Sequence, residues 1–386
     1  MSVTDSPPAG AVPLRENVAL YDELTDGRTA GLRVEELLER AAVAHPGLVP
    51  GPDQLAAERA RALGDQLGIE RAQGHLLAAW LADPETGAHL IESMLRPKPE
   101  SMDLLPAYER DGRVDLGAAA VERQGNLGVV TLTRPERLNA ENDATTAALE
   151  TAVDLVLLDP RSEAGVLRGG VVEHPRYRGR RVFSSGLDLS ELYAGGLSYL
   201  FFIVRELGFV AKMLRGAAAP EGRLEVPWLA GVETFAIGGG AQLLLVMDRV
   251  VAERDATLSL PASREGIIPG AAALRLPRFT GLALARRSIL FDEQWAAEST
   301  EGRLLVDEVV DREAVGDAVA AAAARLLEMG SVSVLANRRA LRAAQEPPDA
   351  FRAFMATYAL EQARCLTSPA LVANLERTWV GRRAEA

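Results

Sequence analysis

The sequence predicts an α/β protein in which one helical region precedes the core and a second follows it. Three observations support this class. Apolar residues recur at helical spacing from Leu32 to about Leu95, hydrophobic strands then alternate with amphipathic helices, and the last segment is again helical. Strands that alternate with helices favour a largely parallel sheet with helices on its faces. The expected domains are 1–110, 111–310 and 311–386.

The region before the core is predicted to begin with an arm and to continue as helices. The first 20 or so residues are rich in proline, glycine and small side chains. From Val34 to Ala41 apolar residues repeat at i, i+3, i+4 and i+7, and the similar spacing over 56–67 predicts another helix. Prolines punctuate residues 96–106, which predicts a linker to the core.

The core is expected to alternate strands and helices. Two strands, over 114–124 and 127–134, meet at a turn on Gly125. A helix follows over 145–159, and then two buried strands over 164–172 and 227–237. The segment 238–253 is expected to form a further helix and then a strand. From Arg312 onward the pattern is helical to the end of the chain. This order of elements is typical of parallel strands that are connected by helices.

The composition is typical of an ordered globular protein. Hydrophobic residues make up 48% and charged residues 25% of the 386 positions, which excludes a disordered or collagen-like chain. The net charge of −12 argues against a nucleic-acid binder, because no basic excess is available to neutralise phosphates. The N-terminal residues lack the pattern of a signal peptide, and no apolar run reaches the ~18 residues that span a bilayer. With a single cysteine, we expect a reduced, cytoplasmic protein without a membrane partner.

Residue types that bind metals and cofactors show no recognisable spacing. The histidines and the cysteine lie far apart, at His45, His75, His89, His174 and Cys365. No pair has the spacing of a zinc or haem site, so we expect no metal, although a site assembled from distant residues stays open. No flavin or nicotinamide fingerprint is present either, because the glycines at 238–240 lack the required pattern. The only two lysines, Lys98 and Lys212, disfavour a Schiff-base mechanism.

Two glycine-bearing turns are the first candidates for chemistry. Glycines 238–240 join a buried strand to a helix, where the backbone turns sharply and a ligand can approach the amides closely. The N-terminus of that helix suits a developing negative charge. A tight strand–helix turn without function is the alternative. The segment 184–188 is a second such turn, and the two together predict amides that converge on one oxygen.

Four segments then carry a family resemblance. They are RPERLNA, FSSGLDLSEL, the block from PWLAG to RVVA, and LPASREGIIPG, at 134–140, 183–192, 227–252 and 260–270. In order and spacing they resemble the crotonase (enoyl-CoA hydratase/isomerase) superfamily, over about residues 121–345. The resemblance implies a ββα spiral with C-terminal oligomerisation helices, assembled as a homotrimer or a dimer of trimers. It also implies an acyl-CoA substrate whose thioester enolate is bound by the backbone N–H groups of Leu187 and Gly239.

The chain departs from the hydratases of this superfamily at their two catalytic glutamates. Gln242 and Ala262 stand at those positions, and neither side chain exchanges a proton at neutral pH. Addition of water to a double bond is therefore disfavoured. A cofactor-independent dioxygenase branch, which acts on 3,5-dihydroxyphenylacetyl-CoA in glycopeptide-antibiotic biosynthesis, shares this departure and the helical N-terminal region. This chain resembles that branch, which implies O2 as co-substrate, 3,5-dihydroxyphenylglyoxylate and CoA as products, and neither metal nor flavin.

The resemblance also implies roles for polar and apolar residues around the substrate. Glu141, Arg205 and Gln242 are expected to contact the ring hydroxyls. The alternatives are a helix-dipole carboxylate for Glu141, an ion pair with a neighbouring helix for Arg205, and a solvated polar residue for Gln242. Ala262 and Ile267 are expected to line an apolar O2 pocket, or else to be two core residues in a turn.

Coenzyme A is expected to bind along the RPERLNA turn. The candidate residues are Arg137, Leu138, Asn139 and Ala140. A basic run nearby could bind the phosphates of coenzyme A, although a solvated charged face is the simpler interpretation. This run contains Arg176, Arg178, Arg180 and Arg181. Asp188 is expected to cap a helix rather than act as a base, and Glu233 has no predicted role.

Two other functions stay open at this point. One is a hydratase, isomerase or thioesterase with relocated acid–base groups, and the other is a non-catalytic acyl-CoA-binding or scaffold protein. The sequence leaves open the base that removes the benzylic proton, the route of O2 and the choice between trimer and hexamer.

Overall fold

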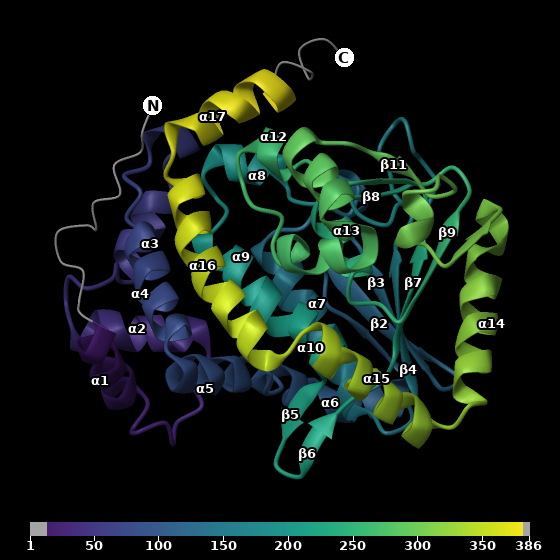
Figure 1. Cartoon of the computed structure of the whole chain (residues 1–386), viewed down its shortest axis with the longest axis horizontal. Helices are drawn as coiled ribbons and strands as arrows, with labels where there is room; N and C mark the ends of the chain where they lie inside the picture. Colours follow the sequence, from purple (N-terminus) through teal and green to yellow (C-terminus); the bar gives the residue numbers. More distant parts are fainter. Residues whose placement is uncertain (1–13, 381–386) are drawn as a thin grey trace.

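The computed structural model describes residues 14–380, and its core is a seven-stranded sheet (Figure 1). The strand order is β1-β2-β3-β4-β7-β9-β12. The bounds are Arg113–Asp115, Ala119–Gln124, Leu127–Leu132, Ala164–Gly169, Trp228–Val232, Arg249–Glu253 and Glu308–Val310. β1, β2 and β3 pair antiparallel, and every pair from β3 to β12 is parallel. The predicted α/β class is confirmed.

Helices cover both faces of this sheet. Along β3, Val130 packs in the cluster that contains α7 (Asp143–Leu158), while its neighbour Val129 packs in the cluster that contains α14 (Val315–Leu327). Successive residues of a strand point to opposite faces, so these two helices lie on opposite sides. Figure 1 shows α14 flanking the sheet at the right.

The predicted strand over 227–237 was wrong in one respect, because it forms two strands in different sheets. β7 ends at Val232, and β8 (Phe235–Ile237) joins β10 (Thr257–Ser259) and β11 (Trp295–Ala296). Thr234, between them, has a φ of +67°, which breaks the extended conformation. Glu233 is buried beside the break and ion-pairs with Arg168. This break directs β8 toward the site described below.

The N-terminal region is helical as expected. Its helices α1 to α6 span Leu14–Leu24, Val34–Ala44, Pro52–Arg59, Arg71–Ala82, Pro84–Met94 and Pro99–Asp111. The predicted arm lies mostly outside the described residues, and helix α1 already begins at Leu14. The helix expected over 56–67 was wrong beyond Arg59, since a short 3-10 turn follows at 63–65 and Leu67 is 71% exposed.

The predicted linker over 96–106 was also wrong, because most of it belongs to α6. Pro99 is the first residue of this helix, where the missing N–H of proline removes no hydrogen bond. Pro106 lies inside the helix. The prolines of this segment, which suggested a linker in the sequence, therefore belong to a helix and its first turn.

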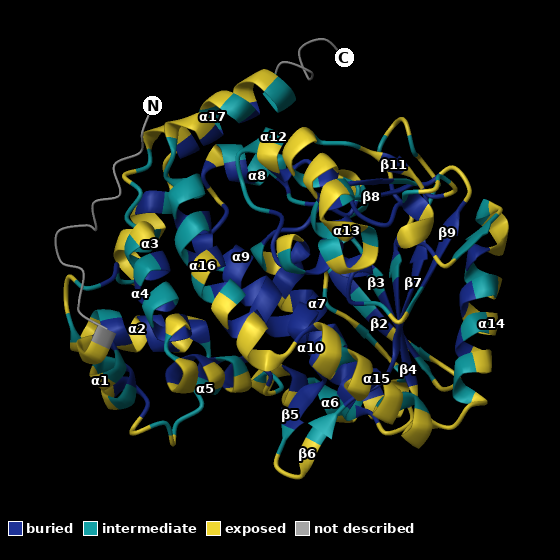
Figure 2. Ribbon diagram, in the orientation of Figure 1, coloured by how far each residue is buried: buried dark blue, intermediate teal, exposed yellow. Residues whose placement is uncertain are grey.

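The C-terminal helices return to the N-terminal region. They are α15 (Ser331–Gln345), α16 (Pro348–Leu366) and α17 (Pro369–Leu375). A Cβ atom placed on Gly74 of α4 would lie 2.4 Å from the Cβ of Ala363 in α16, so the two helices approach closely. Figure 2 shows buried residues concentrated around α9 (Tyr199–Arg205), next to α16. The two terminal regions thus share one hydrophobic core with α9.

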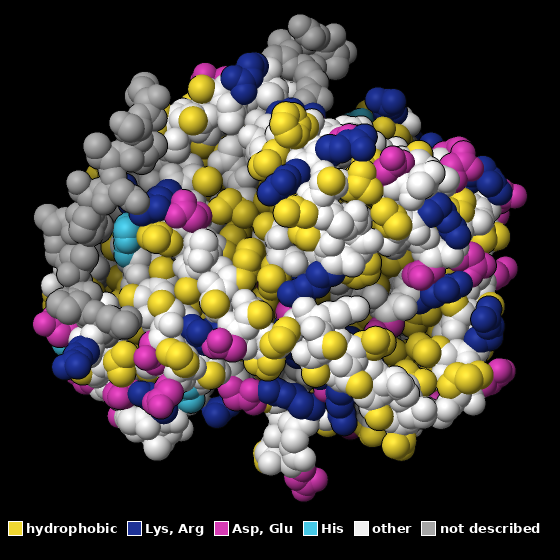
Figure 3. Space-filling model, viewed as in Figure 1, with side chains coloured by type: hydrophobic (Ala, Val, Ile, Leu, Met, Phe, Trp, Pro, Cys, Tyr) yellow, Lys and Arg dark blue, Asp and Glu magenta, His cyan; other side chains and the backbone are white. Residues whose placement is uncertain are grey.

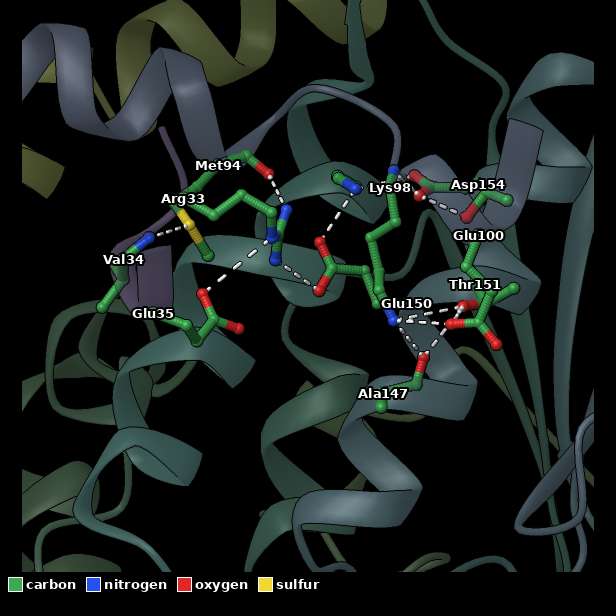
Figure 4. Close-up of polar contacts among 12 residues, drawn as sticks. Arg33, Val34, Glu35, Met94, Lys98, Glu100, Ala147, Glu150, Thr151 and Asp154 are labelled. Atoms are coloured by element: carbon green, nitrogen blue, oxygen red, sulfur yellow. Dashed lines mark hydrogen bonds and ion pairs between the residues drawn. The ribbon is translucent and has the colours of Figure 1, made fainter. Parts of the chain in front are cut away.

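Buried charges also tie the N-terminal region to the core (Figure 4). Lys212 of α10 (Ala211–Arg215) is fully buried, with its Nζ 2.8 Å from Glu150 and 2.7 Å from Asp154 on α7. The Arg33 guanidinium lies 2.8 Å from Glu150, and the Lys98 backbone N–H donates to Asp154 at 2.8 Å. Because a buried charge is stable only when paired, these contacts hold α2 and α6 against α7.

The remaining elements are four helices and one hairpin. Helices α8, α11, α12 and α13 span Leu189–Ala194, Gly239–Leu244, Ala262–Glu265 and Ala272–Phe291, and the hairpin β5–β6 spans Ala217–Ala219 and Gly222–Leu224. Figure 3 shows acidic and basic side chains interspersed over the face that carries α13, α14 and α15. Within residues 14–380 no single helix meets the length and hydropathy needed to cross a membrane, whereas the α14–α15 pair, bent by 98°, meets them jointly.

Candidate active site

The two glycine-bearing turns lie side by side. Ser184 pairs in parallel with Ala236 of β8, and the N–H of Ile237 donates to the Ser184 carbonyl at 3.0 Å. A Cβ atom on Gly186 would lie 3.2 Å from the nitrogen of Gly239, so the two backbones are nearly in contact.

The amides of Leu187 and Gly239 are left without acceptors. The N–H groups next to them are used, since Gly238 donates to the Ser259 carbonyl at 2.8 Å and Asp188 to the Glu141 carbonyl at 2.9 Å. Gly239 is the first residue of α11, where a helix leaves its N–H groups unpaired. Within residues 14–380, neither the Leu187 nor the Gly239 N–H donates to a protein group. Both residues line the same inner cavity.

This inner cavity brings together every residue predicted for the substrate and O2. Its walls include Glu141, Leu187, Arg205, Gly239, Gln242, Ala262 and Ile267. The sequence interpretation missed eight further lining residues: Phe201, Phe202, Glu206, Gly238, Glu265, Ile268, Gly270 and Tyr358. The side chains nearly fill the cavity, which has about 30 Å³ free.

Arg205 organises the polar wall of the inner cavity. Its Nε donates to Glu141 at 2.6 Å and its Nη1 to Gln242 at 3.0 Å and to Glu206 at 2.8 Å. Its Nη2 donates to the Gly239 carbonyl at 2.8 Å. Burial favours the neutral form, but Glu141 and Glu206 outweigh it and raise the pKa of Arg205. Arg205 is thus ion-paired in the cavity wall, but its partners are Glu141, which precedes α7, and the adjacent Glu206, rather than a neighbouring helix as the alternative had it.

A chain of alternating charges runs from this wall into the C-terminal region. Arg275 of α13 lies 3.4 Å from Glu206 and 3.0 Å from Glu346, and Glu346 also ion-pairs with Arg215 at 2.7 Å. Burial would raise the pKa of Glu346, but these arginines lower it to about 2. The cavity wall is therefore coupled to the segment between α15 and α16.

Part of the cavity lining is apolar. Ala262 begins α12 and is buried, and its carbonyl accepts the N–H of Ile267 at 2.9 Å. Phe201 and Phe202 of α9 lie in the same cavity, with their rings edge to face. A glutamate at position 262 would bring a carboxylate into this wall, whereas alanine leaves it apolar.

An outer groove of about 450 Å³ continues from the inner cavity. Leu187 and Glu265 line both spaces, so they mark the neck between them. Of the residues predicted for coenzyme A, Arg137, Leu138 and Ala140 line the groove.

Asn139 does not line the groove, because its side chain holds the turn together. Its Oδ1 accepts the N–H of Arg134 at 3.0 Å and its Nδ2 donates to the Val182 carbonyl at 2.7 Å. Asp188 caps α8 as predicted, since its carboxylate accepts the N–H groups of Ser190 and Glu191.

The basic run is not brought into the groove. Arg180 contacts Glu253, the Arg181 guanidinium donates to the Gly169 carbonyl, and Arg176 and Arg178 are exposed. His174, just before them, does line the groove. Among the described residues, no three His, Cys, Asp or Glu side chains are grouped to hold a metal ion.

Several of the missed residues had a signal in the sequence. Gly238 belongs to the glycine turn at 238–240, and Glu265, Ile268 and Gly270 belong to the segment 260–270. Glu206 follows Arg205 in an apolar stretch, and a buried charge there needs a partner. Tyr358 comes from α16, more than a hundred residues beyond Arg205, and only the packing of α16 brings it to the cavity.

Comparison with known proteins agrees with this architecture. The profile of the enoyl-CoA hydratase/isomerase family matches residues 122–362. A crystal structure of an enoyl-CoA hydratase/isomerase from Mycobacterium paratuberculosis matches 68% of this chain and 100% of its own, with a TM-score of 0.57 and 24% identity. A carnitinyl-CoA hydratase from Mycobacterium avium matches 70% of this chain and 97% of its own, with a TM-score of 0.56 and 26% identity.

Two curated relatives differ in how far they match. The (3,5-dihydroxyphenyl)acetyl-CoA 1,2-dioxygenase of Amycolatopsis orientalis is 49% identical over 349 residues, which cover 89% of this chain and 80% of the relative. A probable enoyl-CoA hydratase of Rhizobium meliloti is 32% identical over 191 residues, which cover 49% of this chain and 67% of the relative. A match over 89% of the chain must extend into the N-terminal helices.

Proposed function

The chain belongs to the enoyl-CoA hydratase/isomerase family, and we propose that it is a dioxygenase that needs no metal or flavin. It converts 3,5-dihydroxyphenylacetyl-CoA and O2 into 3,5-dihydroxyphenylglyoxylate and free CoA. The 49% identical relative supports this substrate and reaction, because its match covers 89% of the chain.

The observation that carries the proposal is the composition of the inner cavity. Two unpaired backbone N–H groups, of Leu187 and Gly239, line it together with Gln242 and Ala262, at the positions where hydratases carry glutamates. Preorganised donors stabilise a thioester enolate, and one such donor is commonly worth about 3 kcal/mol. The cavity therefore supports enolate formation and lacks the two carboxylates that would activate water at those positions.

The reaction then follows from the enolate itself. Removal of a benzylic proton places charge on the thioester oxygen and, through the ring, on the phenol oxygens. One electron passes from this enolate to O2, and the two radicals combine to a peroxide at the α carbon. The peroxide attacks the thioester carbonyl and CoA leaves as the thiol. Loss of the second α proton then leaves its C–H electron pair to form the ketone C=O as the O–O bond breaks, which gives the 2-keto acid. Both oxygen atoms of O2 remain in the product.

The polar and the apolar lining of the cavity suit different parts of this reaction, namely binding of the ring and access of O2. Arg205, with Glu141 and Gln242, offers donors and acceptors to the ring hydroxyls. Ala262 and Ile267 offer an apolar surface beside the reacting carbon, where O2 is more soluble than in water. Since only about 30 Å³ is free, the walls must separate when the aryl group enters.

An oxygen electrode tests the proposal directly. The full chain with 3,5-dihydroxyphenylacetyl-CoA and a chelator should consume one O2 for each thiol released. Turnover of the thioester at an equal rate without O2 would instead support a hydrolytic or hydratase-type enzyme. Binding of the thioester without any product would support a non-catalytic acyl-CoA-binding protein.

Assembly and metabolic role form a further part of the proposal. The family resemblance supports a homotrimer or a dimer of trimers, with the C-terminal helices at the contacts. The product is a 2-keto acid, so an amino-group transfer would yield dihydroxyphenylglycine, a building block of vancomycin-type antibiotics. Light scattering of the full chain tests the assembly.

A further inference from the structure

We propose that the hydroxyl of Tyr358 binds one of the two ring hydroxyls of the substrate and so selects a ring that carries both. This assignment rests on the proposed function, since it concerns recognition of the aryl group at the same site. Tyr358 belongs to α16, lines the inner cavity and is 2% exposed.

The Tyr358 hydroxyl has no partner in the described part of the chain. Within residues 14–380 it makes no hydrogen bond, whereas the neighbouring buried Tyr199 donates to the Ala359 carbonyl at 2.9 Å. A buried hydroxyl without a hydrogen bond is unfavourable, and buried polar groups in proteins are nearly always paired. A substrate oxygen in the inner cavity would supply the missing partner.

The phenol lies near the polar part of the cavity lining. Burial and the charge of Glu206 raise the pKa of Tyr358 well above its ordinary value, while the nearby Arg205 lowers it. The phenol therefore stays protonated and keeps its O–H donor. Its ring stacks on Phe354, one turn earlier in α16, with the ring centroids 5.9 Å apart and the planes at 11°. Tyr358 thus presents a donor close to the arginine that is proposed to bind the substrate ring.

The hydrogen-bond donors of the inner cavity are unequally available. Among the described lining residues, the side chains with N–H or O–H donors are Arg205, Gln242 and Tyr358. Each of the five N–H groups of Arg205 already has a protein acceptor, so a ring oxygen that binds Arg205 must share one of them. The amide nitrogen of Gln242 and the hydroxyl of Tyr358 need no such exchange. They provide one donor for each of the two ring oxygens.

This contact makes Tyr358 a specificity-determining residue. A substrate with a single ring hydroxyl would leave either Tyr358 or the Arg205–Gln242 pair without its partner. A site that is built to hydrogen-bond a substrate hydroxyl discriminates against analogues that lack it, because its buried polar groups then stay unpaired. The proposal therefore predicts selection for two hydroxyls and not merely for an aromatic ring.

Binding of two nonreactive thioether analogues measures this contact without turnover. Both are CoA thioethers with a methylene in place of the thioester carbonyl, and they carry a 3,5-dihydroxyphenyl or a 3-hydroxyphenyl ring. The wild-type full chain should bind the dihydroxyphenyl analogue more tightly. Tyr358→Phe should lower the ratio of the two Kd values about tenfold, as expected for loss of one buried hydrogen bond. The Kd of the 3-hydroxyphenyl analogue should change less than about threefold, because its single hydroxyl binds the Arg205–Gln242 pair.

Tyr199→Phe is the matched control. It removes the same atom from a fully buried tyrosine that packs beside α16 but does not line the inner cavity. This variant should keep the wild-type Kd ratio. In urea denaturation it should lower the midpoint, since it loses the hydrogen bond to Ala359, whereas Tyr358→Phe should not lower it.

Each result decides the assignment. A Kd ratio for Tyr358→Phe equal to that of the wild type, or an equal fall in both variants, would overturn the contact. A wild type that binds the two analogues equally would overturn it even if the thioester and O2 are consumed. The expected fall in the ratio without any O2 uptake by the wild type would overturn the dioxygenase and leave the Tyr358 contact standing.

Discussion

Arg205 donates a hydrogen bond to the carbonyl of Gly239 at 2.8 Å, and the N–H of the same glycine is one of the two proposed oxyanion donors. The residue proposed to bind the ring therefore also fixes the backbone that binds the thioester oxygen. A change in Arg205 that disturbs binding of the ring should therefore also disturb the backbone donor that binds the thioester oxygen.

Replacement of Arg205 by lysine should therefore impair catalysis more than folding. Arg205→Lys keeps the charge but loses the guanidinium geometry that reaches Glu141 and Gly239 together. We expect kcat/KM to fall about 10²-fold, the size of an effect on one preorganised donor. Arg278→Lys, which removes the guanidinium of a half-buried arginine from Glu346 outside the cavity, is the matched control. A kcat/KM for Arg205→Lys equal to that of this control would contradict the role.

Gly186 tests the geometry of the oxyanion donors. It has a φ of +80°, and a Cβ there would lie 2.7 Å from the Ile237 carbonyl oxygen and 3.2 Å from the Gly239 nitrogen. Gly186→Ala should push the two turns apart and lower kcat about 10²- to 10³-fold. Gly179→Ala controls for backbone strain alone, since Gly179 has a φ of +76° with open space around it. Steady-state kinetics should show kcat near wild type for the control, and equal losses in both variants would count against the assignment.

A larger side chain at position 262 should affect the use of O2 more than the binding of the thioester. Ala262→Leu adds three carbons to a cavity with about 30 Å³ free. We expect the KM for O2 to rise several-fold, while the Kd of a thioether analogue changes less. Initial rates at graded O2 concentrations measure the first quantity and a binding titration the second. A larger effect on analogue binding than on O2 would mean that Ala262 lies against the aryl group instead.

Glu346 should make the stability of the protein depend on acid pH. Its folded pKa is lowered from 4.5 to about 2, so its stabilisation is fully present above pH 4.5 and is lost as the pH falls toward 2. At pH 7, Glu346→Gln should lower the free energy of unfolding by about 3 kcal/mol. Urea denaturation at several pH values should show this difference shrinking as the pH falls from 5 toward 3. A difference that does not depend on pH would contradict an origin in the charge of the Glu346 carboxylate.

Much of the site was predictable because its key groups belong to local turns. Leu187 and Gly239 follow glycines whose conformations need little support from the rest of the fold, so their segments are visible in the sequence. Glu141, Gln242, Ala262 and Ile267 were named through the family resemblance rather than from local geometry, and all four line the cavity. Their roles remain predictions.

Residues that depend on long-range packing were not predictable. Tyr358 reaches the cavity only because α16 packs on α4 and α9. The break between β7 and β8 depends on one residue, Thr234, in an otherwise continuous apolar run. The prolines near residue 100 were misinterpreted because proline is as favourable at the first turn of a helix as in a linker.

Isotope labelling tests most directly whether the substrate itself reduces dioxygen in this cavity. The full chain is given 3,5-dihydroxyphenylacetyl-CoA under ¹⁸O2 in ordinary water with a chelator, and the acidic product is analysed by mass spectrometry. A 2-keto acid that carries two ¹⁸O atoms, together with one thiol for each O2 consumed, is the predicted result. Unlabelled dihydroxyphenylacetate as the product would show simple thioester hydrolysis and would contradict the proposed reduction of O2 by the enolate.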